Sequence, residues 1–185
     1  QLLQIVQELG WHGDFDTAED GKERISLAVI DLSSRKPRLA GVYMDNFIYP
    51  ASVYKMYVAA AVLEKISRGE LALTHTHIIA FPNCVDAVRE IRWDPRPVLQ
   101  TGDTVTVNYL LDLMITRSDN TAANCLIDLA QRESINAMMQ ANGWRGSEVT
   151  RKFLSRKHEE AEYQTIRGTE TCALHAADFL YKIYT

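Results

Sequence analysis

Ser52 and Lys55 stand three residues apart in the stretch from Tyr49 to Leu63, which reads YPASVYKMYVAAAVL. An apolar helical pattern follows Pro50, so both residues are expected near a helix start, where side chains three apart share one face. A cation is unfavourable at a helix N-terminus. A lysine in an apolar environment, however, can lose its proton and act as a base. The spacing therefore indicates a serine nucleophile with a lysine base, and the Ser52 backbone N–H as an oxyanion donor.

The same spacing occurs again at Ser33 and Lys36. About one S-x-x-K is expected by chance in a chain of this length. Ser33 and Lys36 lie in the connection SSRKP between two strand-like runs, where a turn is expected. The spacing alone therefore does not identify a site.

The triplet Ser118-Asp119-Asn120 is a second polar motif, 66 residues after Ser52 (118 − 52). Ser, Asp and Asn are preferred capping residues, so one helix ending and another beginning also explains the triplet. Capping does not explain why the triplet follows a helical S-x-x-K at this distance. The pairing of the two motifs favours a catalytic interpretation of both.

S-x-x-K and S-D-N are two of the three motifs typical of class A β-lactamases and penicillin-binding proteins. The sequence resembles that superfamily over residues 22–184, and the resemblance extends beyond the motifs. The segment T-G-D-x-V-T-V-x-x-L-L leads into S-D-N, and N-T-A-A-N-x-L-I follows it. The resemblance implies an α+β, β-lactamase/transpeptidase-like fold.

The resemblance also implies a role for each motif residue. Ser52 is then the acylated nucleophile, and Lys55 is its proton acceptor or part of that network. Ser118 relays a proton to the leaving nitrogen, and Asn120 binds the substrate's side-chain amide and Lys55. Asp119 is structural and holds the backbone of the turn.

The elements that must position these residues follow from local patterns. Two strands before Ser52 predict an antiparallel sheet packed against a mostly helical lobe. We expect one β-lactamase-like domain over 1–185, with the sheet portion in 1–50 and the helical lobe in 51–185. The expected helices are 1–9, 52–68, 105–120, 121–131, 132–141 and 171–184, the expected strands are 24–32 and 38–45, and 70–105 is expected to hold little regular structure.

Two motifs of the resembled superfamily are absent. K-T-G, on a strand beside the nucleophile in similar proteins, does not occur. We therefore expect the C-terminal strands and last helix to be missing, and a further segment or a second chain to complete the sheet. Such a chain is expected to be a poor and unstable enzyme by itself.

The second absent motif, E-x-x-L-N, carries the deacylating carboxylate of class A β-lactamases. Glu159, Glu160 and Glu162 fall in the corresponding region, where a solvated charged loop is the expected structure. Without a base that activates water, an acyl-enzyme persists. The sequence thus leaves three functions open: a serine hydrolase of β-lactams or related amides and esters, a penicillin-binding or D,D-peptidase-like protein acylated without turnover, and an unreactive scaffold.

Composition excludes other classes. The net charge of −4 over 185 residues argues against nucleic acid as a partner, and no apolar run is long enough for a membrane span. The three cysteines form neither a zinc pattern nor a disulfide framework and are expected as buried thiols; His75 and His77 lack a third ligand. We expect a small-molecule substrate, no metal and no cofactor. A periplasmic or secreted location is implied by the resemblance alone.

Overall fold

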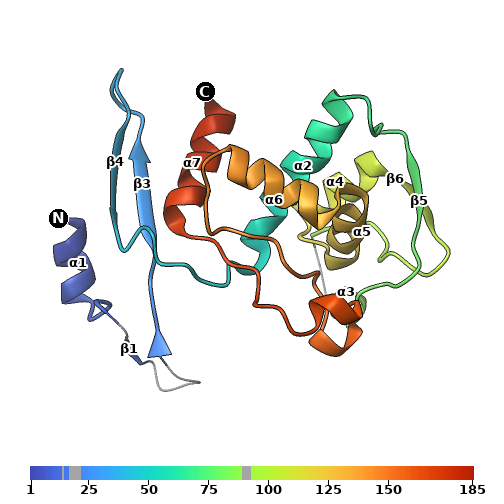
Figure 1. The fold of residues 1–185 in the computed structure, drawn as a ribbon, viewed down its shortest axis with the longest axis horizontal. Helices are drawn as coiled ribbons and strands as arrows, with labels where there is room; N and C mark the ends of the chain where they lie inside the picture. The colour runs from blue at the N-terminus through green and yellow to red at the C-terminus, as the bar shows by residue number, and fades with distance from the viewer. Residues whose placement is uncertain (14, 17–21, 89–92) are drawn as a thin grey trace. The chain divides into compact units, whose positions relative to one another are not determined.

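The structure is a computed structural model that describes residues 1–13, 15–16, 22–88 and 93–185. The chain forms two compact units, each described by itself (Figure 1). Unit 1 comprises Gln1–Pro50, Trp144–Glu148 and Thr169–Thr185, and unit 2 comprises Ala51–Gly143 and Val149–Gly168. One boundary between the units falls after Pro50, and residues 144–148 and 169–185 group with the N-terminal segment.

Unit 1 is built on a β-hairpin. Its elements are α1 (Leu2–Glu8), β1 (Phe15–Asp16), β2 (Lys22–Glu23), β3 (Leu27–Asp31), β4 (Arg38–Val42) and α7 (Ala173–Tyr184). β3 and β4 pair antiparallel from Leu27 opposite Val42 to Asp31 opposite Arg38, which confirms the two expected strands. α1 contacts β4 and α7 contacts β3 (Figure 1). β1 and β2 form a second short antiparallel pair that the local pattern did not predict.

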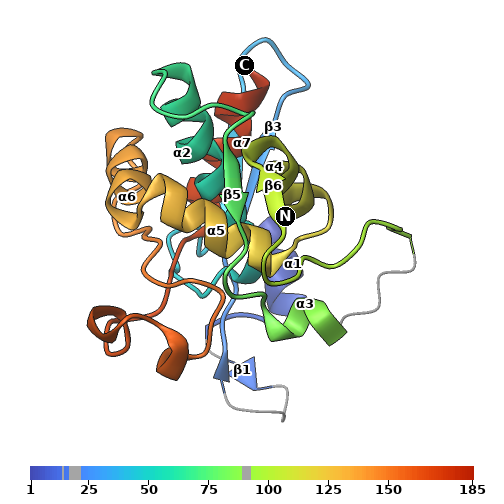
Figure 2. The same cartoon turned by 90° about the vertical axis from the view of Figure 1, so that its right-hand side faces the viewer.

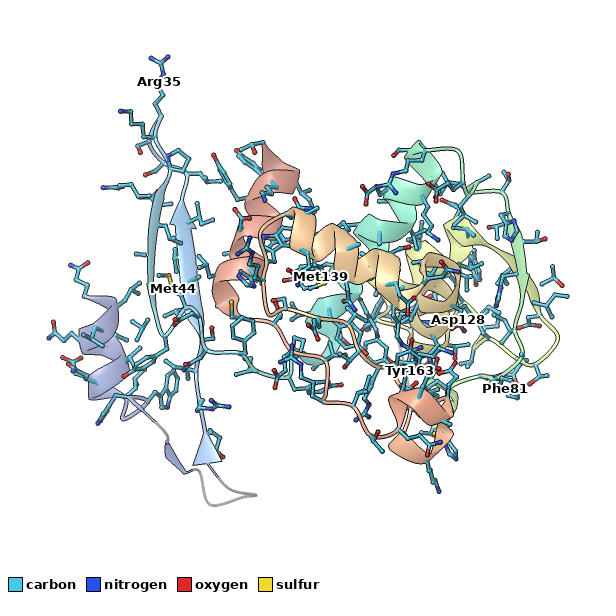
Figure 3. The ribbon with its side chains drawn as sticks, viewed as in Figure 1. Arg35, Met44, Phe81, Asp128, Met139 and Tyr163 are labelled. Carbon is cyan, nitrogen blue, oxygen red and sulfur yellow. The ribbon has the colours of Figure 1, made fainter. Side chains whose placement is uncertain are left out.

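Hydrogen bonds from loop residues fix the start of α7. Ser26 Oγ donates to Met44 O and accepts from the Ala173 backbone N–H at 2.9 Å. Met44 (Figure 3) in turn accepts from the Leu174 backbone N–H at 3.0 Å. A capping hydroxyl of this kind satisfies a donor that the first helical turn leaves without a helical partner. Residues near β3 and β4 therefore determine where α7 begins.

Unit 2 is mostly helical (Figure 2). Its elements are η1 (Ala51–Tyr54), α2 (Lys55–Ser67), β5 (Thr76–Ile78), α3 (Cys84–Val88), β6 (Thr104–Thr106), α4 (Val107–Thr116), α5 (Asn120–Ala130), α6 (Arg132–Ala141), η2 (Arg156–His158) and η3 (Ala161–Tyr163). The expectation of little regular structure over 70–105 was wrong in part, because β5 pairs antiparallel with β6 and α3 lies between them. The expected helices otherwise form, with shifted ends.

α5 is the central helix of unit 2. It packs against α2, α4 and α6, and its side chains are buried on nearly every face. Eight of its eleven residues are buried, the polar Thr121 and Asn124 among them, so the helix belongs to the core of this unit. The position of Asn120, the first residue of α5, therefore depends on the packing of α5 against the three neighbouring helices.

His175 on α7 generates a pH prediction for unit 1. Its Nδ1 lies 2.7 Å from Ser147 Oγ, and its ring packs edge-on against Phe47. Burial lowers the pKa of His175, while the charge of Asp178 opposes this shift. The folded state thus favours the neutral ring. The contribution of His175 to the free energy of unfolding is therefore fully present above the unfolded pKa of about 6.5, and it is lost as the pH falls below that value.

Urea unfolding at about pH 8 and about pH 5.5 measures this loss. His175→Gln should reduce the difference between the two pH values, because glutamine does not titrate. His75→Gln changes an exposed histidine of unit 2 and should leave the difference as in the wild type. Equal pH dependence in the wild type and His175→Gln would contradict the assignment.

Candidate active site

The turn η1 and the start of α2 place Ser52 and Lys55 at one end of a helix. Ser52 lies in the 3₁₀ turn and is exposed, whereas Lys55 is the first residue of α2 and is only 2% exposed. Ala51, just before them, has a φ of 45°. The expected helix start at Ser52 is therefore a 3₁₀ turn followed by an α-helix. The turn exposes the hydroxyl while the amine is buried.

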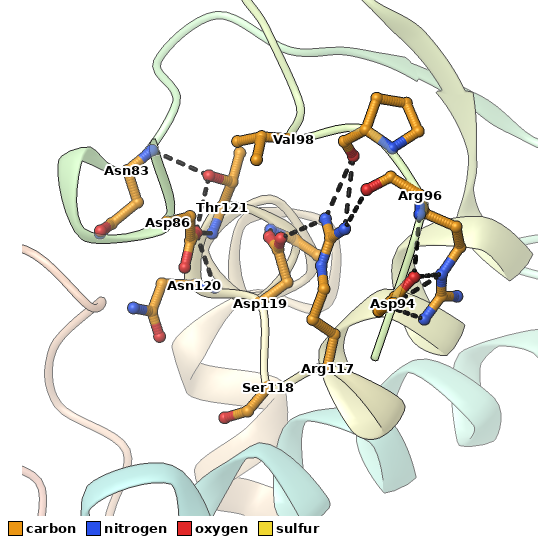
Figure 4. Close-up of polar contacts among 12 residues, drawn as sticks. Asn83, Asp86, Asp94, Arg96, Val98, Arg117, Ser118, Asp119, Asn120 and Thr121 are labelled. Atoms are coloured by element: carbon orange, nitrogen blue, oxygen red, sulfur yellow. Dashed lines mark hydrogen bonds and ion pairs between the residues drawn. The ribbon is translucent and has the colours of Figure 1, made fainter. Parts of the chain in front are cut away.

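Ser118 and Asp119 lie in the connection between α4 and α5, and Asn120 is the first residue of α5 (Figure 4). Ser118 adopts a φ of 56°, which is uncommon for a residue other than glycine. Asp119 is the N-cap of α5, and its Oδ1 accepts from the Ala122 backbone N–H at 2.8 Å. The capping interpretation of the triplet is thus correct for Asp119, and it leaves the side chains of Ser118 and Asn120 free for other contacts.

The structure brings the two motifs together at the Lys55 ammonium. Lys55 Nζ donates to Ser118 O at 2.7 Å, to Ser118 Oγ at 3.0 Å and to Asn120 Oδ1 at 2.8 Å. An ammonium has three N–H donors, and these three acceptors match them in number. A buried charge is stable only when it is hydrogen-bonded or paired. These contacts therefore allow a lysine to be buried at the start of a helix.

Ser118 links the lysine to Ser52. Its Oγ donates to Ser52 Oγ at 2.8 Å and accepts from Lys55 Nζ. The result is a continuous chain of hydrogen bonds from a buried amine, through one hydroxyl, to an exposed hydroxyl. Such a chain can carry a proton in either direction, depending on which end holds it.

The second S-x-x-K has no comparable surroundings. Ser33 and Lys36 are exposed at the β3–β4 connection, beside Arg35 at its tip (Figure 3). The Ser33 backbone N–H donates to Asp31 Oδ1 at 2.8 Å. This contact is typical of a turn. The turn expected from the sequence is therefore confirmed.

A buried ion pair between Arg117 and Asp119 stabilises the S-D-N turn. Arg117 Nη2 lies 2.8 Å from Asp119 Oδ2, and each side chain is 2% exposed (Figure 4). Arg117 also donates to the carbonyl oxygens of Arg96 and Pro97. The expectation that Asp119 acts through backbone structure agrees with both of its contacts. The turn that carries Ser118 and Asn120 is thus anchored on two sides.

Asp86 is a supporting residue that no sequence motif marked. Its Oδ2 accepts from the backbone N–H groups of Asn120 at 2.9 Å and Thr121 at 2.7 Å, and from Thr121 Oγ1 at 3.0 Å (Figure 4). The residue is 3% exposed and belongs to the short helix α3. A carboxylate at a helix N-terminus is favoured by the free N–H groups and the helix dipole. Asp86 therefore fixes the backbone from which Asn120 reaches Lys55.

Glu159 and Glu160 are engaged in ion pairs with Arg132 and Lys152. Glu159 is 4% exposed, with Oε2 at 2.8 Å from Arg132 and Oε1 accepting from the Lys152 backbone N–H. Burial raises the pKa of Glu159. Burial also acts to raise the pKa of Glu160, but its hydrogen bonds with Lys152 and Arg132 outweigh this and lower it to about 2. The expectation of a solvated loop was wrong for Glu159, because Arg132 draws its carboxylate inward.

The neighbouring side chains complete this cluster. Arg132 lies over the ring of Tyr163 (Figure 3), with the guanidinium carbon 3.6 Å from the ring centroid. Glu162 is exposed, as expected, and lines a polar pocket with Glu160 and Tyr163.

Phe153 also contacts the buried amine of Lys55, and no sequence motif marked this residue. Lys55 Nζ lies 4.2 Å from the centroid of its ring. The ring of Tyr54 is stacked on the ring of Phe153, with centroids 4.4 Å apart and planes 8° from parallel. The only sequence signal was one aromatic residue in a polar, charged segment.

The helix-rich α+β fold is that of the β-lactamase/transpeptidase-like structures, as matches to solved structures show. More narrowly, the chain belongs to the beta-lactamase enzyme family, whose model matches residues 13–185. None of the curated proteins compared with the sequence matches it.

Solved structures support the fold. An ancestral (GNCA) class A β-lactamase is 24% identical with a TM-score of 0.69, and the match covers 98% of this chain and 63% of that one. The acyl-enzyme complex of a PBP-A variant with penicillin G is 19% identical with a TM-score of 0.71, covering 100% and 60%. A β-lactamase from Sphaerobacter thermophilus is 24% identical with a TM-score of 0.60, covering 78% and 52%. The chain thus spans less than two thirds of each of these proteins.

In the described parts of the chain, no cluster of three or more His, Cys, Asp or Glu side chains could bind a metal ion. Over the same residues, no helix has the length and apolar character to cross a membrane. Cys125 and Cys172 are buried free thiols as expected, but Cys84 is exposed at the start of α3.

The buried ion pair behind the S-D-N turn yields a stability prediction. Arg117→Met leaves the Asp119 carboxylate buried with its charge partner removed, so the free energy of unfolding should fall by about 3–5 kcal/mol. Arg68→Met removes an exposed pair with Glu64 and should cost about 0.3–0.5 kcal/mol. Urea unfolding monitored by circular dichroism measures both losses. Equal losses in the two variants would show that burial of the Arg117 pair has no special weight.

Proposed function

We propose that the protein transfers an acyl group from a β-lactam, or a related amide or ester, to Ser52 and then to water. The observation that carries this proposal is the hydrogen-bond chain from the buried Lys55 through Ser118 to the exposed Ser52 hydroxyl. A serine hydroxyl is a weak nucleophile until a base removes its proton. The chain connects Ser52 with such a base.

The proton moves along the chain in the direction that the state of Lys55 permits. With Lys55 as an ammonium, donors run from Nζ to Ser118 and from Ser118 to Ser52, as in the structure. With Lys55 as a neutral amine, the chain reverses, and Ser52 donates to Ser118 while Ser118 donates to Nζ. Attack by Ser52 on a carbonyl carbon then delivers its proton to Lys55. Ser118 returns that proton to the leaving nitrogen.

Two other groups complete the proposed chemistry. The Ser52 backbone N–H, at the start of a helical segment, is assigned to the oxyanion that forms on the attacked carbonyl. Asn120 uses its Oδ1 on Lys55. Its side-chain NH₂ has two donors, which we assign to the substrate's side-chain amide.

The second candidate is a penicillin-binding or D,D-peptidase-like protein that is acylated with little turnover. Its support is the engagement of the Glu159 and Glu160 carboxylates by Arg132 and Lys152. Deacylation needs a base that activates water. One of the similar solved structures is an acyl-enzyme with penicillin G. A periplasmic or secreted location, and a further segment or second chain completing the sheet, belong to the proposal.

Labelling with a fluorescent penicillin tests the nucleophile. The full chain should carry one covalent label, observed by mass, and Ser52→Ala should carry none. Ser33→Ala, in the exposed turn with the same spacing, should label like the wild type. Transient label identifies the hydrolase and persistent label the penicillin-binding protein. An unlabelled wild type that also hydrolyses no ester would show an unreactive scaffold.

The base is tested by replacing the lysine. Lys55→Met should slow label formation by about 10²- to 10⁴-fold, the usual contribution of a general base. Lys65→Met, on the same helix and contacting only the Leu129 carbonyl oxygen at 3.4 Å among the contacts described, is the matched control and should label normally. Label formation in Lys55→Met at the rate of Lys65→Met would exclude Lys55 as the base.

A further inference from the structure

Phe153 is held against the catalytic lysine by neighbours from separate elements. Its ring stacks on Tyr54, which is 1% exposed in the turn η1. Its backbone N–H donates to Asn124 Oδ1 of α5 at 2.8 Å. Its carbonyl oxygen accepts from Asn83 Nδ2. Since both asparagines are buried, the position of the ring is built into the core.

The ring affects what can happen beside Lys55. A cation over an aromatic face is attracted by the ring quadrupole, so Phe153 favours the position that Nζ occupies in the structure. The ring also fills space on that side of the amine with a group that accepts no proton. Water and a base are therefore excluded from the volume that Phe153 occupies.

Two acidic residues that follow Phe153 in the same loop are held in ion pairs. Glu159 and Glu160 follow Phe153 by six and seven residues, and their oxygens are bound by Arg132 and Lys152. Hydrolysis of an ester on Ser52 requires a base that accepts a proton from the attacking water. An aromatic ring on the amine and carboxylates in ion pairs together disfavour that step.

We infer that Phe153 is a positioning residue that makes the acyl-enzyme long-lived, because it holds Lys55 in place and keeps a water-activating base from its loop side. The inference rests on the proposed acylation of Ser52, and it favours the second candidate, in which the acyl group passes to water only slowly. A carboxylate in place of the ring should create the missing base. Water then adds to the ester carbonyl, the carboxylate takes its proton, the bond from the acyl carbon to Ser52 Oγ breaks, and Oγ regains a proton.

The test compares Phe153→Glu with Phe153→Gln after labelling with a fluorescent penicillin. Both variants lose the ring and have similar volume, so any change in label formation is common to both. Release of label should be at least about tenfold faster in Phe153→Glu, since general bases contribute 10²- to 10⁴-fold. The wild type and Phe153→Leu should retain label about as long as Phe153→Gln. Rates of formation and release are measured separately, and a merely structural change would not separate Glu from Gln.

The outcomes distinguish the two proposals. A wild type that never becomes labelled overturns acyl transfer by Ser52. A wild type that is labelled, together with equal release from Phe153→Glu and Phe153→Gln, overturns the role of Phe153 alone. If circular dichroism shows that Phe153→Glu does not fold, Phe153→Ala is labelled and treated with sodium formate, with sodium chloride as the control. Formate should speed release from Phe153→Ala and not from the wild type, and no effect on either would overturn the inference.

Discussion

A lysine side chain that is buried at the first residue of a helix is the constraint on which the site depends. The helix dipole opposes a cation there, and burial removes the water that would solvate it. Ser118 and Asn120 supply three oxygen acceptors, and Phe153 supplies a ring face. These compensating groups come from the start of α5 and from a distant loop. Burying Lys55 therefore requires unit 2 to be folded, and the site cannot form from η1 and α2 alone.

The groups that contact the Lys55 amine are themselves held in place by a second set of residues. The start of α5 must present its oxygen atoms toward Lys55, and two carboxylates hold it in that orientation. Asp119 caps the helix and pairs with Arg117, while Asp86 binds the next two backbone N–H groups. A single cation is thus stabilised by a polar network that includes two buried carboxylates, and among the described residues Asp86 Oδ1 is the carboxylate oxygen of this network without a hydrogen-bond partner.

The sequence predicted the elements that have strong local patterns. The strands around the SSRKP turn and the helices of unit 2 follow from periodicity, and the contact between Lys55 and Asn120 follows from the resemblance that the paired motifs carry. Asp86 and Phe153 could not be predicted in this way. Asp86 acts through contacts with residues more than 30 positions away and Phe153 through a contact with Lys55 more than 90 positions away, and nothing in the neighbouring sequence indicates those contacts. The prediction for Glu159 was wrong because a charge-dense segment was interpreted as surface, whereas its partner Arg132 lies on the helix α6, far away in the sequence.

The conformation of Ser118 has a consequence for how such a site can change. A φ of 56° costs a residue with a side chain of the order of 1–3 kcal/mol, and glycine would adopt it without this cost. Glycine would also remove the hydroxyl that joins Lys55 to Ser52. Selection for stability and selection for chemistry therefore act in opposite directions at this one position. A lineage that no longer used the reaction would be free to relax the turn, so the identity of this residue records whether the site is still in use.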